Sequence, residues 1–482
     1  MVGSGIMFTS MLIMKVMVFV NYIIAARLLT PDDYGAWSIV LNLQNFFVIV
    51  ACFGIPVVMT KKVSEWVSDN SSMARSLGSA LLTIVVVSSA VVALGYVILA
   101  RTIAVDLYHD ERLVSVFRLS ALFVFVSALN MAMSALLQGC QRITAIAKIN
   151  AVVAVLWQPL SFGTIAAFGL EGALLAQIVA NALSAVLFFM VSRRALQVSF
   201  SSAHSVFRDR EQLRSLISLT IPSFLSTVMI APAYWIGRTV LVLDWGFSSV
   251  GQFQIAESLS QILLVIPAAM SIPLLPMISE QHARDAGSVG KMSGSLLRLA
   301  VFLLIPLSMG VMPVLEFVIV NLYGASYADA HSPAILMFAA SALIAAGTVV
   351  SNVIFGVGRM WDALFLNLLW LVAFLSLVLY LVPLYGSDGL GTTYAISYAM
   401  YLILLLLYFR RKFGVDVARM GLYASAFILY VFVYKVFLLD ASSYLRDSIT
   451  LGSVATFIVV GYLFVLGQEE RAHILAFIAR RD

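Results

Sequence analysis

Three charged side chains interrupt long apolar stretches, and their chemistry suits contact with an ion inside a membrane. Lys15 lies in the middle of the apolar stretch 6–26, and Arg238 and Glu257 lie in the later stretches 214–243 and 249–278. A charge at the centre of a bilayer costs about 3 kcal/mol or more unless it faces water or a counter-charge. The three residues therefore predict a polar cavity bordered by helices.

Each charge has two interpretations that the sequence leaves open. Lys15 is either a cavity cation that contacts an anionic substrate or one member of a structural ion pair. Arg238 is either its counterpart or a side chain that reaches the interface from the outer end of its span. Glu257 either binds a coupling cation or proton, because burial raises the pKa of a carboxyl group, or neutralises Lys15 or Arg238.

Amide side chains accompany these charges. Asn21 lies in the first apolar stretch and Asn45 in the second, and both are candidate substrate-binding residues. An amide both donates and accepts hydrogen bonds, so a wall of amides tolerates many sugars. The alternative is hydrogen bonding between helices, worth about 1 kcal/mol per bond. Further amides are Asn42, Gln44, Gln252, Gln254 and Gln261.

The composition indicates that these residues lie in membrane-spanning helices. Of the 482 residues, 62% are hydrophobic and only 11% are charged, too few to cover a soluble protein of this size. Apolar runs of about 20 residues, the length of one membrane crossing, recur along the chain. We therefore predict an all-α integral membrane protein with fourteen transmembrane helices: 5–27, 36–60, 76–100, 113–138, 143–168, 171–192, 214–243, 249–278, 294–321, 332–357, 361–384, 388–409, 418–439 and 448–467.

The loop charges predict the orientation. Most of the 29 Lys and Arg residues fall on the side of the membrane shared by the two termini, which the positive-inside rule places in the cytoplasm. The longest connection, 196–213, is rich in arginine and is expected to be a linker, with room for an amphipathic helix on the membrane surface.

An internal repeat organises the spans. Several Gly, Arg and Asn residues recur at a constant separation, which predicts two parallel six-helix lobes with the substrate path between them. We expect a first lobe at 1–195, a second lobe at 214–412, and an appendage of two helices with a tail at 413–482. The matched residues are Gly139, Arg142, Asn150, Gly169, Gly172 and Arg193-Arg194, which recur as Gly356, Arg359, Asn367, Gly386, Gly389 and Arg410-Arg411.

Signatures of several enzyme classes are missing from the sequence. There is no Gly-x-x-x-x-Gly-Lys-Ser/Thr loop, so nucleotide hydrolysis is not expected. The five histidines are scattered without metal-ligand spacing. We predict a transporter rather than an enzyme, with no cofactor and no nucleic-acid partner; coupling to protons, sodium ions or the membrane potential stays open.

The segment that follows the first span carries a resemblance. Ala26 to Leu29, Thr30-Pro31, Asp32-Asp33 and Tyr34-Gly35 spell ARLLTPDDYG. This segment resembles the opening of bacterial O-antigen and lipid-linked oligosaccharide flippases of the multidrug/oligosaccharidyl-lipid/polysaccharide (MOP) superfamily. The resemblance implies two lobes around a central cavity with alternating access, located in the bacterial inner membrane.

The resemblance also implies a substrate. It would be a polyprenyl-pyrophosphate carrier bearing a surface-polysaccharide repeat unit, with Lys15 and Arg238 as candidates to receive the pyrophosphate, and a polysaccharide polymerase and a chain-length regulator as candidate partners. A drug/cation antiporter of the same superfamily is the first alternative, for which we expect carboxylates in the first lobe. A membrane polymerase or ligase is the second, for which we expect a large outer loop that this sequence lacks.

Overall fold

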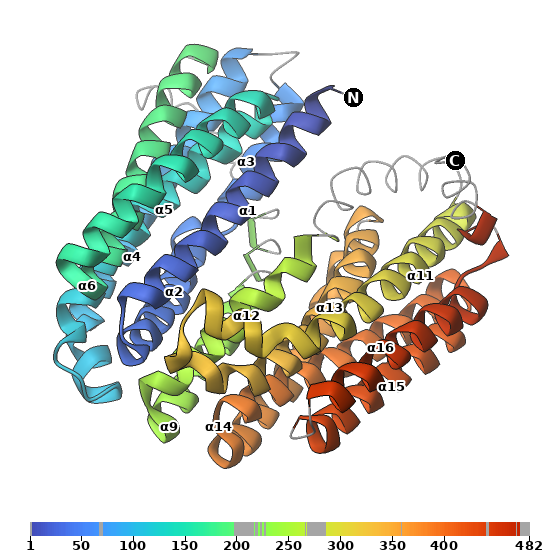
Figure 1. Ribbon diagram of the computed structural model, residues 1–482. Coiled ribbons are helices and arrows are strands. Elements are labelled where there is room, and N and C mark those ends of the chain that lie inside the picture. The colour runs from blue at the N-terminus through green and yellow to red at the C-terminus, as the bar shows by residue number, and fades with distance from the viewer. Residues whose placement is uncertain are drawn as a thin grey trace. The chain divides into compact units, whose positions relative to one another are not determined.

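The computed structural model describes most of the chain as helix (Figure 1). It covers residues 2–66, 71–196, 230–265, 286–357, 359–439, 443–468 and 470–472, with single residues 216, 220, 221, 224, 225, 228, 229 and 267. No strand occurs among these residues. The chain divides into two compact units, Met1–Gly251 and Gln252–Asp482.

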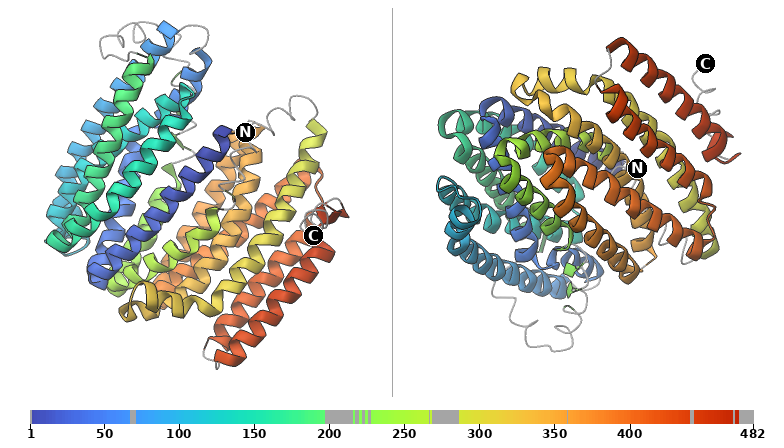
Figure 2. Two further views of the ribbon diagram at one scale, coloured as in Figure 1. Left: turned by 45° about the horizontal axis from the view of Figure 1, so that its top comes forward. Right: turned by 90° about the horizontal axis from the view of Figure 1, so that it is seen from below.

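The first unit is a bundle of long helices. In it α6 packs against α1 and α5, and α4 packs against α5 (Figures 1 and 2). Its elements are α1 (Val2–Leu28), α2 (Pro31–Cys52), α3 (Ile55–Trp66), α4 (Ser71–Arg101), η1 (Thr102–Leu107), α5 (Leu113–Gly139), α6 (Ile143–Leu196) and the part of α9 (Ile230–Ser260) that ends at Gly251.

The second predicted span differs from the structure. It starts at Pro31 instead of residue 36, and its continuous helix ends at Cys52. Phe53 and Gly54 adopt left-handed φ angles of 46° and 72°, and a new helix starts at Ile55. The reason is local: Pro56 lacks an N–H and is tolerated in the first turn of a helix but not in its interior, so a break precedes it.

The second unit holds the remaining elements. There α11 packs against α13 and α16, and it also contacts α15. The elements are η3 (Gln261–Leu264), α11 (Ala286–Val311), η4 (Met312–Val314), α12 (Leu315–Leu322), η5 (Ala325–Ala330), α13 (His331–Gly356), α14 (Met360–Phe413), α15 (Ala418–Val433), η6 (Tyr434–Leu438), α16 (Ser443–Val460) and η7 (Gly461–Val465).

One helical hairpin occurs in both units. Helices α6 and α14 each have 54 residues and bend at a glycine, Gly169 with φ 56° and Gly386 with φ 59°. Three residues further on, a Cβ at Gly172 or Gly389 would lie 1.9 or 2.2 Å from a backbone carbonyl oxygen of the preceding arm. Only glycine fits this left-handed bend and close approach. Each arm is then about one membrane crossing long, as the paired spans of the sequence predicted.

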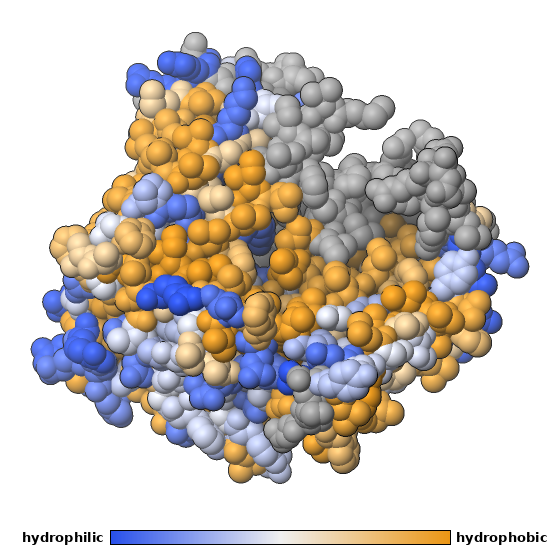
Figure 3. Space-filling view, viewed as in Figure 1, coloured by the Kyte–Doolittle hydropathy of each residue, from blue (hydrophilic) through white to orange (hydrophobic). Residues whose placement is uncertain are grey.

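The helix surfaces suit a membrane. Within the described residues, nine helical stretches are long and apolar enough to cross a bilayer, and the stretches at 143–194 and 361–413 are the two hairpins. Large apolar side chains are exposed along them, and Figure 3 shows hydrophobic residues over much of the visible surface. The count of fourteen extends beyond the described residues, since the predicted spans 214–243 and 249–278 are described only in part.

The predicted linker 196–213 lies almost entirely outside the described residues. The contact-based division at Gly251 assigns the first part of α9 to the first unit. The continuously described part of predicted span seven, residues 230–243, therefore groups by contacts with the first unit.

Candidate functional site

Two adjoining cavities of 290 and 540 Å³ lie inside the first unit. Both are bordered by α2, α5 and α6; α1 contributes to the smaller and α3 to the larger. They share the lining residues Asn45, Phe123, Asn130, Asn150 and Asn181. Four of these five are asparagines, so the two cavities form one region whose walls are rich in amides.

The polar lining follows helical spacing. Helix α5 contributes Ser127, Asn130, Ser134 and Gln138, which recur every three or four residues and so share one face. The second arm of α6 contributes Gln177, Asn181 and Ser184 in the same way. This cluster was not predicted from the sequence, although polar residues at this spacing on otherwise apolar helices were the available signal.

Some of these amides are already paired. Asn130 Nδ2 donates to Asn181 Oδ1 over 2.9 Å, and Asn181 Nδ2 donates to the carbonyl oxygen of Gln177 over 2.9 Å. Gln44 Nε2 donates to Gln177 Oε1 over 3.2 Å. These bonds tie α2, α5 and α6 together around the cavity.

Other polar groups of the lining have no protein partner among the described residues. They include the Asn45 and Asn150 amides and two buried atoms, Gln44 Oε1 and Ser127 Oγ. A buried polar group without a partner costs about 1–3 kcal/mol. These groups are therefore available to bind a polar ligand.

The lining has no formal charge. Among the described residues that line the two cavities there is no Asp, Glu, Lys, Arg or His. Across the described residues, no cluster of His, Cys, Asp and Glu is suited to hold a metal ion. The cavity offers neutral donors and acceptors, which suit hydroxyl-rich ligands.

The predicted residues of α1 and α2 lie at different places. Asn45 lines both cavities. Asn21 is buried and donates to Ser161 Oγ over 2.6 Å, so it joins α1 to α6. Lys15 is exposed on α1 and forms no ion pair with any described residue, whereas Met14 next to it lines the smaller cavity.

Arg238 and Glu257 lie in α9, on either side of the unit boundary. Arg238 is fully buried, and its Nη1 donates to the Tyr234 carbonyl oxygen over 3.3 Å. It does not extend to an exposed interface in this conformation. Glu257 is half-buried in the second unit.

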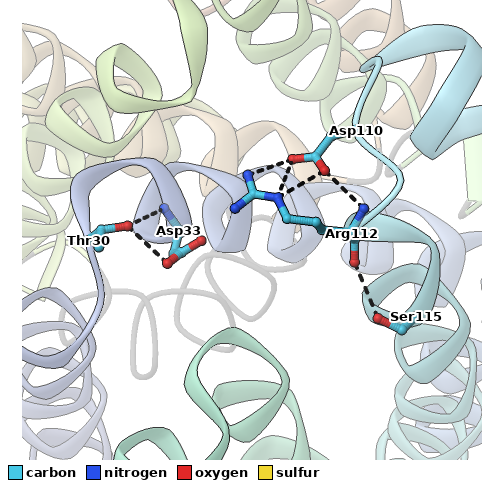
Figure 4. Close-up of polar contacts among 5 residues, drawn as sticks. All are labelled: Thr30, Asp33, Asp110, Arg112 and Ser115. Carbon is cyan, nitrogen blue, oxygen red and sulfur yellow. Dashed lines mark hydrogen bonds and ion pairs between the residues drawn. The ribbon is translucent and has the colours of Figure 1, made fainter.

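The segment TPDDYG starts α2 (Figure 4). The Asp33 backbone N–H donates to Thr30 Oγ1 over 3.2 Å, and Thr30 Oγ1 donates to Asp33 Oδ2 over 2.9 Å. This reciprocal cap satisfies one of the free N–H groups at the helix start. One turn later Gly35 lies directly against α9: a Cβ there would be 1.8 Å from the Phe247 carbonyl oxygen. The motif therefore caps α2 and allows its close contact with α9.

The loop before α5 has its own ion pair (Figure 4). Arg112 Nη2 lies 2.8 Å from Asp110 Oδ2, and the hydrogen bonds from Arg112 lower the pKa of the Asp110 carboxyl group. The hydroxyl of Tyr108, just before this loop, shares a 2.8 Å hydrogen bond with Thr239 and accepts one from Trp235 Nε1 over 2.9 Å. These contacts attach the end of η1 to α9 within the first unit.

Comparison with known proteins identifies the family. The family described as "Polysaccharide biosynthesis protein" matches residues 2–282, more than half of the chain. The chain belongs to the polysaccharide biosynthesis protein family. This membership confirms the resemblance that the ARLLTPDDYG segment indicated.

Individual relatives agree with this membership. The EPS I polysaccharide export inner membrane protein EpsE of Ralstonia solanacearum is 23% identical over 392 residues, which are 79% of this chain and 87% of EpsE. The solved lipid II flippase MurJ, in an inward closed conformation, is similar with a TM-score of 0.69 at 11% identity, over 95% of this chain and 97% of MurJ. An inward-facing multidrug resistance MATE transporter of the MOP superfamily has a TM-score of 0.68 at 15% identity, over 83% and 94%. The chain therefore shares its fold with these transporters.

Proposed function

We propose that this member of the family is a flippase of the bacterial inner membrane. It moves a polyprenyl-pyrophosphate-linked oligosaccharide from the inner to the outer leaflet by alternating access. The observation that carries this proposal is the uncharged cavity of the first unit, lined by amides and hydroxyls. Family membership and the polysaccharide export protein among the relatives support it.

The cavity chemistry favours a sugar over a cationic drug. Amide side chains donate to and accept from sugar hydroxyls without selecting one sugar. A cation exchanger of the same fold needs a carboxylate that binds or releases the coupling ion, and the described lining of the two cavities offers none. A MATE-like antiporter remains the competing function because the fold is shared.

The charged head of the substrate needs a cation. A pyrophosphate cannot enter hydrocarbon unpaired, because an isolated buried charge is very costly. We assign this contact to Lys15, which is exposed on the helix that also borders the smaller cavity. Arg238 would join only after a rearrangement that uncovers it. Glu257 is our candidate for ion coupling, and no cofactor takes part.

Replacing Lys15 by Ala and by Arg tests this assignment. We expect Lys15→Ala to lower surface polysaccharide at least tenfold at matched protein levels, and Lys15→Arg to retain most of it. The control is Lys61→Ala, which removes an exposed cation of the same unit from α3. Normal export by Lys15→Ala would refute the pyrophosphate contact.

A deletion strain distinguishes the flippase from the enzyme alternatives. Loss of a flippase leaves lipid-linked repeat units on the inner leaflet, whereas loss of a polymerase still allows single units to reach the surface. Labelling of the accumulated units with a membrane-impermeant reagent decides between the two. Units that are accessible from outside would refute the flippase.

A further inference from the structure

A groove of 440 Å³ separates the last two helices of the second unit. One wall is a single face of α15, formed by Arg419, Leu422, Tyr423 and Ala426 at helical spacing. The other wall comes from α16 and η7, with Thr456, Phe457, Val460, Phe464 and Val465. The groove is therefore largely apolar, with one cation at its end.

The two walls of the groove are bridged at one point. The Tyr423 hydroxyl donates to the Phe457 carbonyl oxygen over 2.9 Å, and the two rings lie 5.2 Å apart. Both α15 and α16 pack against α11, and α15 also packs against η7, which continues α16. The outer rim stays uncovered: Leu422 is 73% exposed and Phe464 is 59% exposed. In a membrane-spanning helix pair, such a surface faces lipid chains.

Arg419 makes the end of the groove electropositive. It lies in the first turn of α15, where the helix dipole is positive and where no acidic residue is present. Arg419 is exposed and forms no ion pair with a described residue. Asp416 caps the helix start, where it accepts a hydrogen bond from the Ala418 N–H, and it keeps its negative charge. The end of α14, just before it in the chain, adds the exposed Arg410, Arg411 and Lys412, so this stretch of the chain carries more positive than negative charge.

A second groove of the same unit provides a contrast. It has 860 Å³ and lies among α13, α14, α15 and η6, with Lys435 as its cation. There Lys435 Nζ lies 3.1 Å from Asp388 Oδ2, which also accepts a hydrogen bond from Ser332. Because this cation is neutralised internally, the second groove has no preference for an anionic headgroup.

We propose that the α15–α16 groove binds one anionic phospholipid of the surrounding membrane. The phosphate lies at Arg419 and the start of α15, and an acyl chain follows Leu422, Ala426 and Phe464 along the groove. Basic pockets between transmembrane helices bind anionic headgroups in this way. This site is independent of the proposed transport path, and it gives the two helices beyond the repeat a role as a lipid anchor.

Native mass spectrometry of the full-length protein in detergent tests the site. The probes are dioleoyl phosphatidylglycerol and dioleoyl phosphatidylcholine, which share their chains and differ in net charge. We expect one phosphatidylglycerol to bind about fivefold more tightly than phosphatidylcholine, the effect of about one surface cation. Arg419→Ala should remove this preference, and Arg419→Lys should restore it.

Two further variants separate charge from packing. Lys435→Ala removes a cation of the neighbouring groove and should leave the preference unchanged. Ala426→Phe fills the groove and should weaken both lipids alike, with the thermal unfolding of each variant confirming that it is folded. Equal binding of the two lipids to the wild type, or an unchanged preference in Arg419→Ala, would overturn the site. Displacement of phosphatidylglycerol by stoichiometric undecaprenyl phosphate would instead assign the groove to the transport substrate.

Discussion

At the scale of single residues, Asn21 and Asn45 both lie in apolar helices but make different contacts. Asn45 faces a cavity without a protein partner among the described residues, whereas Asn21 is buried and bonded to Ser161. Both looked like substrate contacts in the sequence, because an amide in an apolar helix suits either role. Only the packing of the helices distinguishes the amide that faces the cavity from the amide that is hydrogen-bonded to Ser161.

This difference predicts opposite phenotypes. Asn45→Ala should reduce polysaccharide export severalfold with little change in stability, since it removes only a cavity contact. Asn21→Ala should lower the free energy of unfolding by about 1 kcal/mol, the value of one interhelical hydrogen bond, with export reduced only as far as protein levels fall. Export at matched expression and thermal unfolding in detergent measure the two effects. Equal loss of stability in both variants would contradict the assignment.

Gly35 carries the second residue-scale prediction. Gly35→Ala would place a methyl group 1.8 Å from the Phe247 carbonyl oxygen, a backbone atom that cannot rotate away. We expect a destabilisation of about 3 kcal/mol or more, because the helices must separate. The matched control is Gly95→Ala on α4, where a Cβ meets nothing within 4 Å. Comparison of detergent-extracted folded yield tests both, and a normal yield for Gly35→Ala would contradict the close packing.

At the scale of elements, the internal repeat could be recognised in the sequence because particular backbone conformations require particular residue types. A left-handed bend requires glycine, so Gly169 and Gly386 recur at corresponding positions of α6 and α14. The cavity could not be recognised from the repeat, because its polar lining residues Gln177, Asn181 and Ser184 do not recur at the corresponding positions of α14. Cavity walls depend on which side chains meet across helices, and a single sequence does not specify that.

The two copies differ at one face. The amide face of α6 corresponds in α14 to three tyrosines, since Gln177, Asn181 and Ser184 are replaced by Tyr394, Tyr398 and Tyr401. The Tyr398 ring lies 5.2 Å from Trp370, the Tyr394 ring lies 5.1 Å from Phe374, and the Tyr401 ring packs against Tyr398. The second unit thus fills with aromatic packing at the positions where the first unit keeps a polar cavity.

Exchanging the two residue types tests this asymmetry. Asn181→Tyr should keep the protein folded but abolish export, because the larger ring fills the cavity. Tyr398→Asn should cost about 3 kcal/mol of stability, because it leaves a cavity in an aromatic core. Export and unfolding temperature measured for both variants give the answer. Undiminished export by Asn181→Tyr would show that the cavity takes no part in transport.

The segment after η7 is attached by a titratable pair. Arg298 Nε and Nη2 donate to Glu470 Oε1 over 3.0 and 2.6 Å. Burial alone would raise the pKa of Glu470, but hydrogen bonds from Ser295 and Arg298 bring it below its usual value. A lowered folded-state pKa stabilises the protein above the unfolded-state pKa, and this contribution is lost as the pH falls through the folded value.

Glu470→Gln should therefore lower the unfolding temperature at pH 7 by a few degrees. The difference from wild type should shrink as the pH falls below the ordinary glutamate pKa and through the lower folded-state pKa, where the wild-type carboxyl group also becomes protonated. Parallel melts at pH 7 and over a series of acidic pH values measure it, and Asp416→Asn is a control at an exposed carboxylate. A difference that persists unchanged in acid would show that the pair does not supply the stabilisation.

At the scale of the whole molecule, the sequence predicted the helical membrane architecture and most span positions. It did so because membrane crossings require about 20 apolar residues and satisfied backbone bonds, which are local properties. The division of the described contacts at Gly251 was not predicted, since it depends on the packing of α9 against distant segments such as the start of α2. The contact of Lys15 with the substrate pyrophosphate stays a prediction.

The last prediction concerns the energy source for the whole transport cycle. A pyrophosphate head with roughly two negative charges gains about 5 kcal/mol when it moves outward across 100 mV, inside negative. If half of this acts on the rate-limiting step, flipping should accelerate by several tens of fold. Proteoliposomes with lipid-linked substrate and a potassium diffusion potential of either sign measure the rate. Collapsing the potential should remove the acceleration in wild type and in Glu257→Gln alike. The contrary outcome is a rate that is independent of the potential but depends on a proton or sodium gradient in wild type and not in Glu257→Gln. That outcome would show that ion coupling at Glu257, and not the charge of the substrate, drives transport.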